Sequence, residues 1–325
     1  MILVTGSNGF IGGNVIRRVS NKAEVAAMDI NPGNKKEHVS NIICDIRIKN
    51  AITDICSFDV DKIVHSASII SPKLCMLEPH LAYMTNIIGT LNVLEMARKK
   101  DVKKFVYISS GGVYRNGLST DTITEEWPTN PSGFYAISKL TSEYTIAEFS
   151  KNYGIPAVAL RITAPYGRGM IKPETRIGIP DALHRHTLLF AMKALRNEDI
   201  IMPYGGDHTV NYTYVEDIID GVESALNSEL KGFESFNITS GRLLTIRELG
   251  NAFGRINNKI KVNIGPGDLM HEDYTGNPLL ARLSIKQGRF DITKAKNMLG
   301  YNPSRPLDDG LKDLIDYLKE GSIMP

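Results

Sequence analysis

Two residues one helical turn apart, Tyr135 and Lys139, carry side chains suited to proton transfer. Residues at positions i and i+4 of a helix share one face. A lysine ammonium beside a tyrosine stabilises the phenolate form, which lets the phenol act as a general acid or base at a substrate hydroxyl. Ser110, at the end of a predicted strand, can hydrogen-bond the same oxygen. The three residues predict chemistry at a carbon that bears a hydroxyl group.

A glycine-rich turn follows the first predicted strand, with glycines spaced three apart. Glycines have no Cβ atom, so the chain can turn tightly and its N–H groups can approach a pyrophosphate. The next helix adds its positive N-terminal end. An ordinary glycine-rich turn is the alternative. The predicted dinucleotide site comprises Gly6, Asn8, Gly9, Phe10, Ile11 and Gly12.

Asp29, at the end of the second predicted strand, indicates which dinucleotide is bound. A carboxylate there accepts hydrogen bonds from the adenosine ribose and repels a 2′-phosphate. The following Ile30–Pro32 holds no arginine, so we expect NAD rather than NADP, although Lys35 and Lys36 lie close. Asp45, after the third predicted strand, suits either the adenine amino group or a strand-end or helix-capping role.

The elements that must position these residues alternate in type along the first 160 residues. Short β-branched runs, apolar on both faces, predict central parallel strands: Met1–Thr5, Glu24–Asp29, Asn41–Cys44, Lys62–Ser66, Phe105–Ser109 and Ala157–Arg161. Longer segments between them predict crossover helices, among them Phe10–Ser20, Pro79–Lys100 and Tyr135–Tyr153. This alternation predicts an α/β fold with a Rossmann-type doubly wound parallel sheet.

The C-terminal half predicts a smaller, partly interleaved α/β substrate domain. Its expected elements are a strand at Phe236–Thr239 that returns to the sheet, helices over Pro180–Arg196, Thr245–Ile256, Ile292–Leu299 and Leu307–Leu318, and a loop over Gly265–Asn277. We expect residues 1–167, with about 207–240, to form the NAD-binding domain. Residues 168–206 and about 241–325 form the substrate-binding domain.

The charge, apolar runs and cysteines of the chain exclude several classes of binding partner. The 325 residues include 38 lysines and arginines and 36 aspartates and glutamates, a net charge of +2. This near-balance gives no reason to expect nucleic acid or a membrane surface, and no apolar run approaches the roughly 18 residues that span a bilayer. Three cysteines without a CxxC pair suggest neither a disulfide framework nor a zinc site. We therefore expect no metal. The low, odd number of cysteines predicts a reducing, cytoplasmic setting, and a glycine as early as Gly6 is not expected in a signal peptide.

The chain resembles the extended short-chain dehydrogenase/reductases, the group that includes sugar-nucleotide epimerases and dehydratases. The matching stretches follow the family order: Thr5–Gly12, Asp29, Cys44–Ile46, His65–Ala67, Asn86–Thr90, Ser109–Tyr114, Tyr135–Lys139, Arg161–Gly167, Tyr214–Asp217 and Asp291–Gly300. The resemblance implies a catalytic triad of Ser110, Tyr135 and Lys139 around NAD. It implies further cofactor contacts at Ile30, Asp45, Ile46, Ala67, Asn86 and Ser109, with Tyr135 and Lys139 again.

The sequence departs from this family at positions that decide the reaction. Dehydratases of the family carry Thr-Asp-Glu where this chain has Ser110-Gly111-Gly112, so no acid or base for removing water stands there. Val210 and Ala164 replace an arginine and an asparagine that contact the substrate diphosphate in sugar-nucleotide members. The basic residues that could substitute for them are Arg168, Lys172, Arg176, Arg185, Arg282 and Arg289.

Several other polar residues have more ordinary interpretations. His65 is expected to be packed and hydrogen-bonded within its strand, and Asp217 to cap a helix. His184 and His186 are two apart, which does not place two imidazoles on one helical face, so they predict no metal site. Arg115, where the family has glycine, is either solvated or an anion ligand in the cleft.

Three functions stay open from the sequence. We expect an NAD-dependent epimerase of a sugar or sugar nucleotide, by transient oxidation of a secondary hydroxyl and re-reduction. The first alternative is an NAD-dependent dehydrogenase of a non-nucleotide sugar, sugar acid or small alcohol, and the second is a non-catalytic NAD-binding protein. The resemblance also implies a homodimer through a four-helix bundle, supported by an apolar stripe of Met76, Tyr83, Met84 and Ile87.

Overall fold

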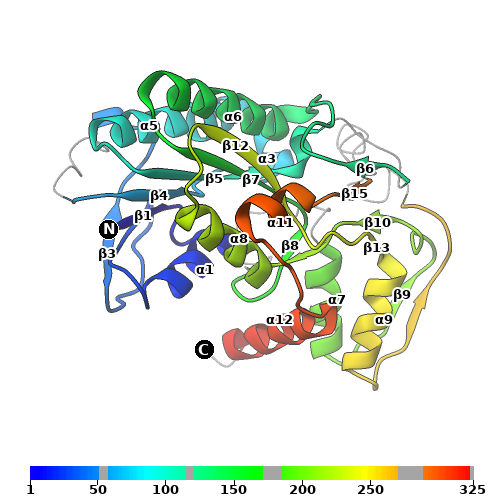
Figure 1. The fold of residues 1–325 in the computed structure, drawn as a ribbon. Coiled ribbons are helices and arrows are strands. Elements are labelled where there is room, and N and C mark those ends of the chain that lie inside the picture. Colours follow the sequence, from blue (N-terminus) through cyan, green and yellow to red (C-terminus); the bar gives the residue numbers. More distant parts are fainter. Residues whose placement is uncertain (51–57, 115–119, 171–184, 270–287, 323–325) are drawn as a thin grey trace.

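The computed structural model describes residues 1–50, 58–114, 120–170, 185–269 and 288–322. Its centre is a seven-stranded parallel sheet with the strand order β12-β7-β5-β4-β1-β2-β3 (Figure 1). The strands are β1 (Ile2–Thr5), β2 (Val25–Asp29), β3 (Val39–Ile43), β4 (Lys62–His65), β5 (Lys104–Ser110), β7 (Ala157–Ile162) and β12 (Phe233–Ile238). This order confirms the doubly wound fold, because the chain reverses direction across the sheet between β1 and β4.

Helices cover both faces of the sheet. One face packs against α5 (Gly89–Lys99) and α6 (Gly133–Tyr153). The other packs against α1 (Phe10–Val19), α8 (Val215–Asn227) and α11 (Thr293–Leu299). Figure 1 shows α5 and α6 above the sheet, with α1 and α8 below it.

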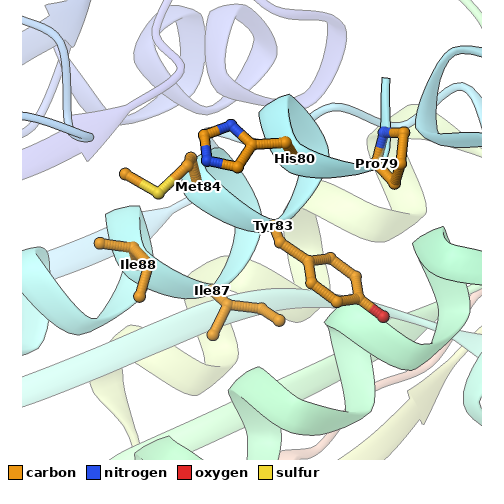
Figure 2. A pocket seen from close by; sticks show the side chains of 6 residues that line it. All are labelled: Pro79, His80, Tyr83, Met84, Ile87 and Ile88. Atoms are coloured by element: carbon orange, nitrogen blue, oxygen red, sulfur yellow. The ribbon is translucent and has the colours of Figure 1, made fainter. Parts of the chain in front are cut away.

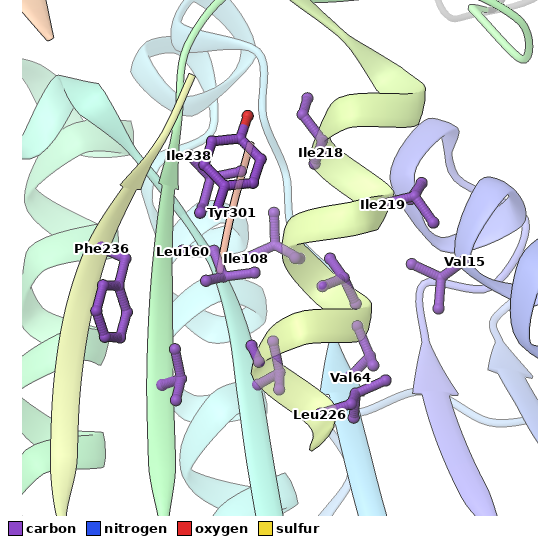
Figure 3. Packing of buried hydrophobic residues seen from close by; sticks show 14 of the residues in the cluster. Val15, Val64, Ile108, Leu160, Ile218, Ile219, Leu226, Phe236, Ile238 and Tyr301 are labelled. Carbon is purple, nitrogen blue, oxygen red and sulfur yellow. The ribbon is translucent and has the colours of Figure 1, made fainter. Parts of the chain in front are cut away.

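Alternate residues of each central strand fill the two cores. In β1, Leu3 belongs to the core under α5 and α6, whereas Val4 belongs to the opposite core. Figure 3 shows this second core, where Ile219 of α8 faces Val15 of α1 and Leu160 of β7 lies beside the helix. The edge strand β3 differs from the expectation of two apolar faces: Ile43 is 68% exposed, and β3 is the last strand in the sheet order.

The helix expected over Pro79–Lys100 changes geometry in the middle. After α3 (Pro72–Leu77), the chain forms α4 (Pro79–Tyr83), then a π-helical turn, η1 (Met84–Ile88), and then α5. A π turn rotates the following residues relative to a regular helix and is frequent at functional sites. This one contains Asn86.

The smaller C-terminal part has its own core. The helices α7 (Arg185–Leu195), α9 (Ile246–Ile256) and α12 (Leu307–Ser322) pack together there. A capping box of Thr245 and Glu248 starts α9. Short strands also form pairs: β8 (Pro165–Tyr166) with β11 (Thr213–Tyr214), β9 (Ile200–Met202) with β14 (Val262–Ile264), β10 (Thr209–Val210) with β13 (Leu244–Thr245), and β6 (Thr122–Ile123) with β15 (Arg289–Phe290). Most of the loop expected over Gly265–Asn277 lies outside the described residues.

The expectation that Asp217 caps a helix is wrong. The residue that precedes α8 is Tyr214, so Asp217 lies inside the first turn. Its buried carboxylate accepts a hydrogen bond from Nη1 of Arg305 at 2.6 Å. The apolar run at Ile218–Val222 marks the buried face of α8, whereas the helix already starts at Val215.

Candidate active site

The glycine loop forms a narrow backbone cradle at the carboxyl end of β1. Gly6 has a positive φ of 67°, and a Cβ there would lie 2.7 Å from the backbone of Ala67. A Cβ on Gly12 would lie 2.1 Å from the carbonyl oxygen of Gly6. Gly9 precedes α1 without any side chain to cap the first N–H groups of the helix. Open N–H groups in a cradle that a Cβ would fill suit a pyrophosphate, so the loop fits a dinucleotide.

Other predicted loop residues support this cradle. The Asn8 amide donates to the carbonyl oxygens of Asn31, at 2.8 Å, and Pro32, which holds the chain after β2 against the glycine loop. Phe10 and Ile11 pack partly into the core under α1 and α8. These three side chains therefore shape the loop around the expected cofactor.

The two predicted adenosine carboxylates differ in their surroundings. Asp29 accepts hydrogen bonds from the backbone N–H groups of Asn8, at 3.0 Å, and Asn31, at 3.1 Å, and next to it Ile30 is 60% exposed. Asp45 pairs with Arg47, whose guanidinium hydrogen bonds lower the carboxyl pKa. A strand-end role for Asp45 therefore accounts for its geometry.

Two further predicted cofactor residues, Ile46 and Ala67, lie where the chain packs closely against a glycine. The side chain of Ile46 is buried against α5, where a Cβ on Gly89 would lie 2.6 Å from its Cδ1. The Ala67 N–H donates to Oγ1 of Thr5 at 3.3 Å, beside Gly6. Both residues remain predicted cofactor contacts.

Buried His65 links this region to the π turn, and its expected packed role is confirmed. Its Nδ1 lies 2.6 Å from Oγ1 of Thr5 and its Nε2 lies 2.9 Å from Oγ1 of Thr90. Because the Thr90 hydroxyl donates to the carbonyl of Asn86, His65 carries its proton on Nε2. Burial, together with the charge of Lys139, lowers the pKa of His65 to about 3, so the ring is neutral.

Asn86 joins three segments at the predicted nicotinamide side. Its Oδ1 accepts from the Ile69 N–H at 2.8 Å and from the Ser68 hydroxyl at 3.0 Å. Its Nδ2 donates to the Ile69 carbonyl and, at 2.9 Å, to the hydroxyl of Ser138 on α6. The π turn thus fixes the loop after β4 against the helix that carries the tyrosine and the lysine.

The predicted catalytic residues converge from β5 and α6. Lys139 is buried, and its Nζ donates to the carbonyl oxygen of Ile108 at 2.8 Å, lying 5.9 Å from the centre of the Tyr135 ring and 4.8 Å from that of Tyr107. Burial lowers the pKa of Lys139 to about 7, opposed by the charges of Glu143 and Cys75. Ser110 ends β5, and its Oγ accepts from the Gly112 N–H at 3.1 Å.

The structure contains a buried ionic network, one helical turn beyond Lys139 on α6, that was not predicted from the sequence. Glu143 pairs with Arg161, with 2.6 Å between Oε2 and Nη2. The Ser109 hydroxyl donates to Oε1 of Glu143 at 2.5 Å. The side chain of the predicted cofactor residue Ser109 is therefore bound to Glu143. The signal available in the sequence was the spacing of Glu143, one turn after Lys139 on the same helix face.

The structure also describes Ala164 and Val210, where the sequence departs from the family, and Arg168, which could substitute for the missing phosphate contacts. Ala164 has a φ of 31°, in the left-handed region where asparagine is enriched among non-glycine residues. Val210 lies in β10, partly buried against the C-terminal core. Arg168 pairs with Asp313 and Glu320 of α12, so its guanidinium serves to hold that helix.

The other basic candidates are less informative. Arg289 is exposed on β15, and Arg185 begins α7. Arg115, Lys172, Arg176 and Arg282 lie outside the described residues, as does His184. His186 is buried in α7, with its ring 5.8 Å from that of Phe190. Within the described ranges, no cluster of three or more His, Cys, Asp or Glu side chains could hold a metal ion, and none of the helices is long and apolar enough to cross a membrane.

Comparison with known proteins agrees with this geometry. The model of the NAD dependent epimerase/dehydratase family matches residues 2–239. The chain is 30% identical to a putative UDP-glucose 4-epimerase of Methanocaldococcus jannaschii, over 99% of both chains. The crystal structure of the Thermotoga maritima UDP-glucose 4-epimerase with UDP-glucose has a TM-score of 0.80 at 27% identity, covering 99% of both chains. That of the Thermus thermophilus UDP-glucose 4-epimerase with NAD has a TM-score of 0.78 at 25% identity, covering 98% of both.

The glycine cradle, the parallel sheet and the helix that carries Tyr135 and Lys139 therefore have a common origin with those of known enzymes. The chain belongs to the NAD-dependent epimerase/dehydratase family, within the extended short-chain dehydrogenases/reductases.

Proposed function

We propose that this protein is an NAD-dependent 4-epimerase of a sugar nucleotide of the UDP-hexose class. The observation that carries the proposal is the position of Lys139, whose Nζ donates to the Ile108 carbonyl of β5 and lies 5.9 Å from the centre of the Tyr135 ring, in a fold whose glycine cradle suits a dinucleotide. The relatives named above, a putative UDP-glucose 4-epimerase and two UDP-glucose 4-epimerases with crystal structures, support the substrate class.

The side chains divide the reaction between them. Tyr135 removes the proton from the secondary hydroxyl, Ser110 hydrogen-bonds the reacting oxygen, and Lys139 stabilises the phenolate and holds the cofactor ribose. NAD held in the glycine cradle would supply a reversible acceptor for the hydride of that carbon. The ketone turns over in the site between the two transfers, and Tyr135 then protonates the oxygen, so the configuration at carbon is inverted.

The run after Ser110 favours this outcome over loss of water. Gly111 and Gly112 follow Ser110, and neither offers an acid or a base. A dehydratase needs both, in addition to the redox cofactor. The proposal therefore confines the chemistry to proton and hydride transfer at one carbon.

A dehydrogenase of a sugar without a nucleotide is the competing function, and specific observations favour it. Val210 packs against the C-terminal core, Ala164 has no polar side chain, and Arg168 is paired with α12. None of the three offers a free polar group to a diphosphate. In an epimerase the diphosphate would then bind to other cations of the chain.

Purified protein separates these functions. We expect stoichiometric NAD(H) to survive gel filtration, and UDP-glucose and UDP-galactose to interconvert without added cofactor. Tyr135→Phe should keep the bound cofactor and lose turnover by roughly a hundredfold or more. An empty protein that reduces added NAD with a free sugar or sugar acid would establish the dehydrogenase, and bound NAD without turnover on any sugar would support a non-catalytic role.

We also propose a homodimer that forms through α4, η1 and α6. An apolar groove lies along α4 and η1, with Tyr83, Met84, Ile87 and Ile88 on its lining (Figure 2). Tyr83 makes an edge-on contact with Phe134 of α6, at 5.7 Å between ring centres, which joins the two helices into one surface. Ile88 is 37% exposed and Phe134 is 38% exposed. A second copy of this chain would cover these side chains.

Sedimentation at micromolar concentration tests the dimer. We expect a dimeric mass for the natural chain and a monomeric mass for Ile88→Glu, because a buried unpaired carboxylate opposes association. Ile201→Glu, which changes a 63% exposed isoleucine of the C-terminal part, is the matched control. A monomeric mass for the natural chain contradicts the proposal.

The remaining expectations accompany this function. We propose that residues 1–167 with about 207–240 bind NAD, and that 168–206 with about 241–325 bind the sugar. The separate core that α7, α9 and α12 form supports that division, although α11, within 241–325, packs against the sheet. We also propose that the protein is cytoplasmic, since Cys44 and Cys75 are buried free thiols.

A further inference from the structure

The carboxylate of Glu143 is fixed one helical turn beyond Lys139. It is 2% exposed, and Arg161 Nε donates to its two oxygens at 3.1 and 3.2 Å while Nη2 donates to Oε2 at 2.6 Å. The Ser109 hydroxyl adds a fourth bond, from the strand that also carries Ser110. Three elements, α6, β5 and β7, therefore hold this charge in place.

Arg161 also makes hydrogen bonds on the side that faces away from Glu143. Its Nη1 donates to the hydroxyl of Tyr114 at 2.8 Å, and that hydroxyl donates to Oδ1 of Asn237 on β12 at 2.8 Å. Burial opposes the charge of Arg161, but the hydrogen bonds and charge of Glu143 outweigh it and raise the arginine pKa. Arg161 is thus charged, and it is hydrogen-bonded to Glu143 on one side and to Tyr114 on the other.

Lys139 has no such direct partner among the described residues. Its Nζ donates to a neutral carbonyl and faces the rings of Tyr107 and Tyr135. The other groups around it are the Cys75 thiol of α3, the neutral His65 of β4 and Glu143 of its own helix. The negative charge of Glu143 raises the pKa of Lys139 and is the largest effect that opposes the lowering of this pKa by burial.

We propose that Glu143, held by Arg161 and Ser109, is a positioning residue that keeps Lys139 charged and so sets the pH range in which Tyr135 reacts. This inference rests on the proposed function of the triad. A buried ion pair adds little net stability compared with apolar residues of similar size. Its place one turn from the catalytic lysine is explained by the electrostatic field that it supplies there.

The test compares Glu143→Gln with the natural chain and with Glu148→Gln, which removes an exposed carboxylate from the same helix. Glutamine keeps an acceptor for Ser109 but removes the charge. We expect the alkaline limit of kcat to move to lower pH by about one unit or more, so that turnover falls roughly tenfold at a fixed pH on that limb. Bound NAD should be retained, Glu143→Asp should largely restore the natural pH profile, and Glu148→Gln should leave it unchanged.

A second measurement does not need activity. The ultraviolet difference between each protein and its Tyr135→Phe form measures the phenolate absorbance of Tyr135. This absorbance should appear at higher pH in Glu143→Gln than in the natural chain, because Lys139 loses the charge that stabilises the phenolate before Tyr135 ionises. Direct removal of a negative charge would shift it to lower pH. A lower or unchanged midpoint therefore overturns the inference, as does an unchanged pH profile of kcat.

Two outcomes need separate treatment. If the natural chain interconverts no sugar nucleotide, the proposed function fails, while the absorbance titration still decides the role of Glu143. If Glu143→Gln does not fold, the double variant Glu143→Gln/Arg161→Gln leaves no unpaired buried charge and should show the same direction of shift with a smaller amplitude. No shift in the folded double variant also overturns the inference.

Discussion

The neutral imidazole of His65 makes the stability of the protein depend on pH. Its pKa is about 3 in the fold, against about 6.5 in an unfolded chain. Below pH 6.5 the unfolded chain takes up a proton that the folded chain does not, so stability falls as the pH drops toward 3. Between pH 7 and pH 5 this group should remove about 2 kcal/mol.

Urea unfolding at the two pH values measures this loss. His65→Gln should flatten the dependence, because no imidazole titrates. His38→Gln is the control: His38 is exposed and Glu24 raises its pKa, so its removal changes the slope slightly and with the opposite sign. An unchanged slope in His65→Gln contradicts the assignment.

Two adjacent glycines differ sharply in the space around them. A Cβ on Gly111 would lie 2.6 Å from Cγ2 of Thr163 and 2.7 Å from Cζ of Phe290, whereas one on Gly112 would make only ordinary contacts. Gly111→Ala should cost about 1–3 kcal/mol. It should also lower kcat by roughly tenfold to a hundredfold, because it displaces Ser110.

Gly112→Ala provides the matched control for that variant. Its nearest neighbours would be Oγ of Ser110 at 3.4 Å and Cβ of Ala136 at 3.7 Å. We expect near-natural stability in urea and a small change in kcat. Equal effects of the two substitutions would show that space around Gly111 does not position Ser110.

At the scale of elements, the junction of β1 and α1 depends on one glycine of the helix and not on its neighbour. A Cβ on Gly12 would lie 2.1 Å from the Gly6 carbonyl, but one on Gly13 would lie 3.5 Å from the nearest atom. Gly12→Ala must push the helix away from the strand and open the cradle. Gly13→Ala only exchanges glycine for a better helix former, a gain of up to about 1 kcal/mol.

Cofactor content and thermal unfolding distinguish the two variants. We expect purified Gly12→Ala to carry little or no NAD and Gly13→Ala to carry the natural amount with an equal or higher melting temperature. Natural cofactor content in Gly12→Ala would mean that the close approach of α1 to β1 is not required for binding.

At the scale of the whole molecule, Arg168 links the segment after β8 to α12, where its partner Asp313 is 145 residues away in the sequence. Its guanidinium binds Asp313 and Glu320 of α12 and lies 5.7 Å from the ring centre of Tyr317. Because the pair is partly exposed, Arg168→Ala should cost only about 1–2 kcal/mol. Lys319→Ala, which removes an exposed pair with Asp316 inside the same helix, should cost at most about 0.5 kcal/mol.

Urea unfolding and its salt dependence test this contact. The loss in Arg168→Ala should shrink at high ionic strength, since screening weakens the partly exposed pairs of the natural chain. A loss no larger than that of Lys319→Ala would mean that α12 is held by its other contacts, its apolar face and the pair of Asp308 with Arg255 among them.

The sequence by itself determined the parallel sheet, the glycine loop, the carboxylate at Asp29 and the spacing of Tyr135 and Lys139. Each of these depends on residues that are near one another in the chain, and the periodicity of strands and helices turns such spacing into geometry. The same reasoning was wrong for Asp217, whose partner Arg305 is 88 residues away.

The tertiary structure alone decided which side chains meet across elements. Glu143 reaches Arg161 and Ser109 because α6 lies over β5 and β7, and Asn86 reaches Ser138 because a π turn rotates it toward α6. Sequence spacing cannot give the relative rotation of packed elements, which depends on how their side chains interdigitate. For this reason the candidate triad could be predicted from the sequence, whereas the ion pair of Glu143 with Arg161 could be found only in the fold.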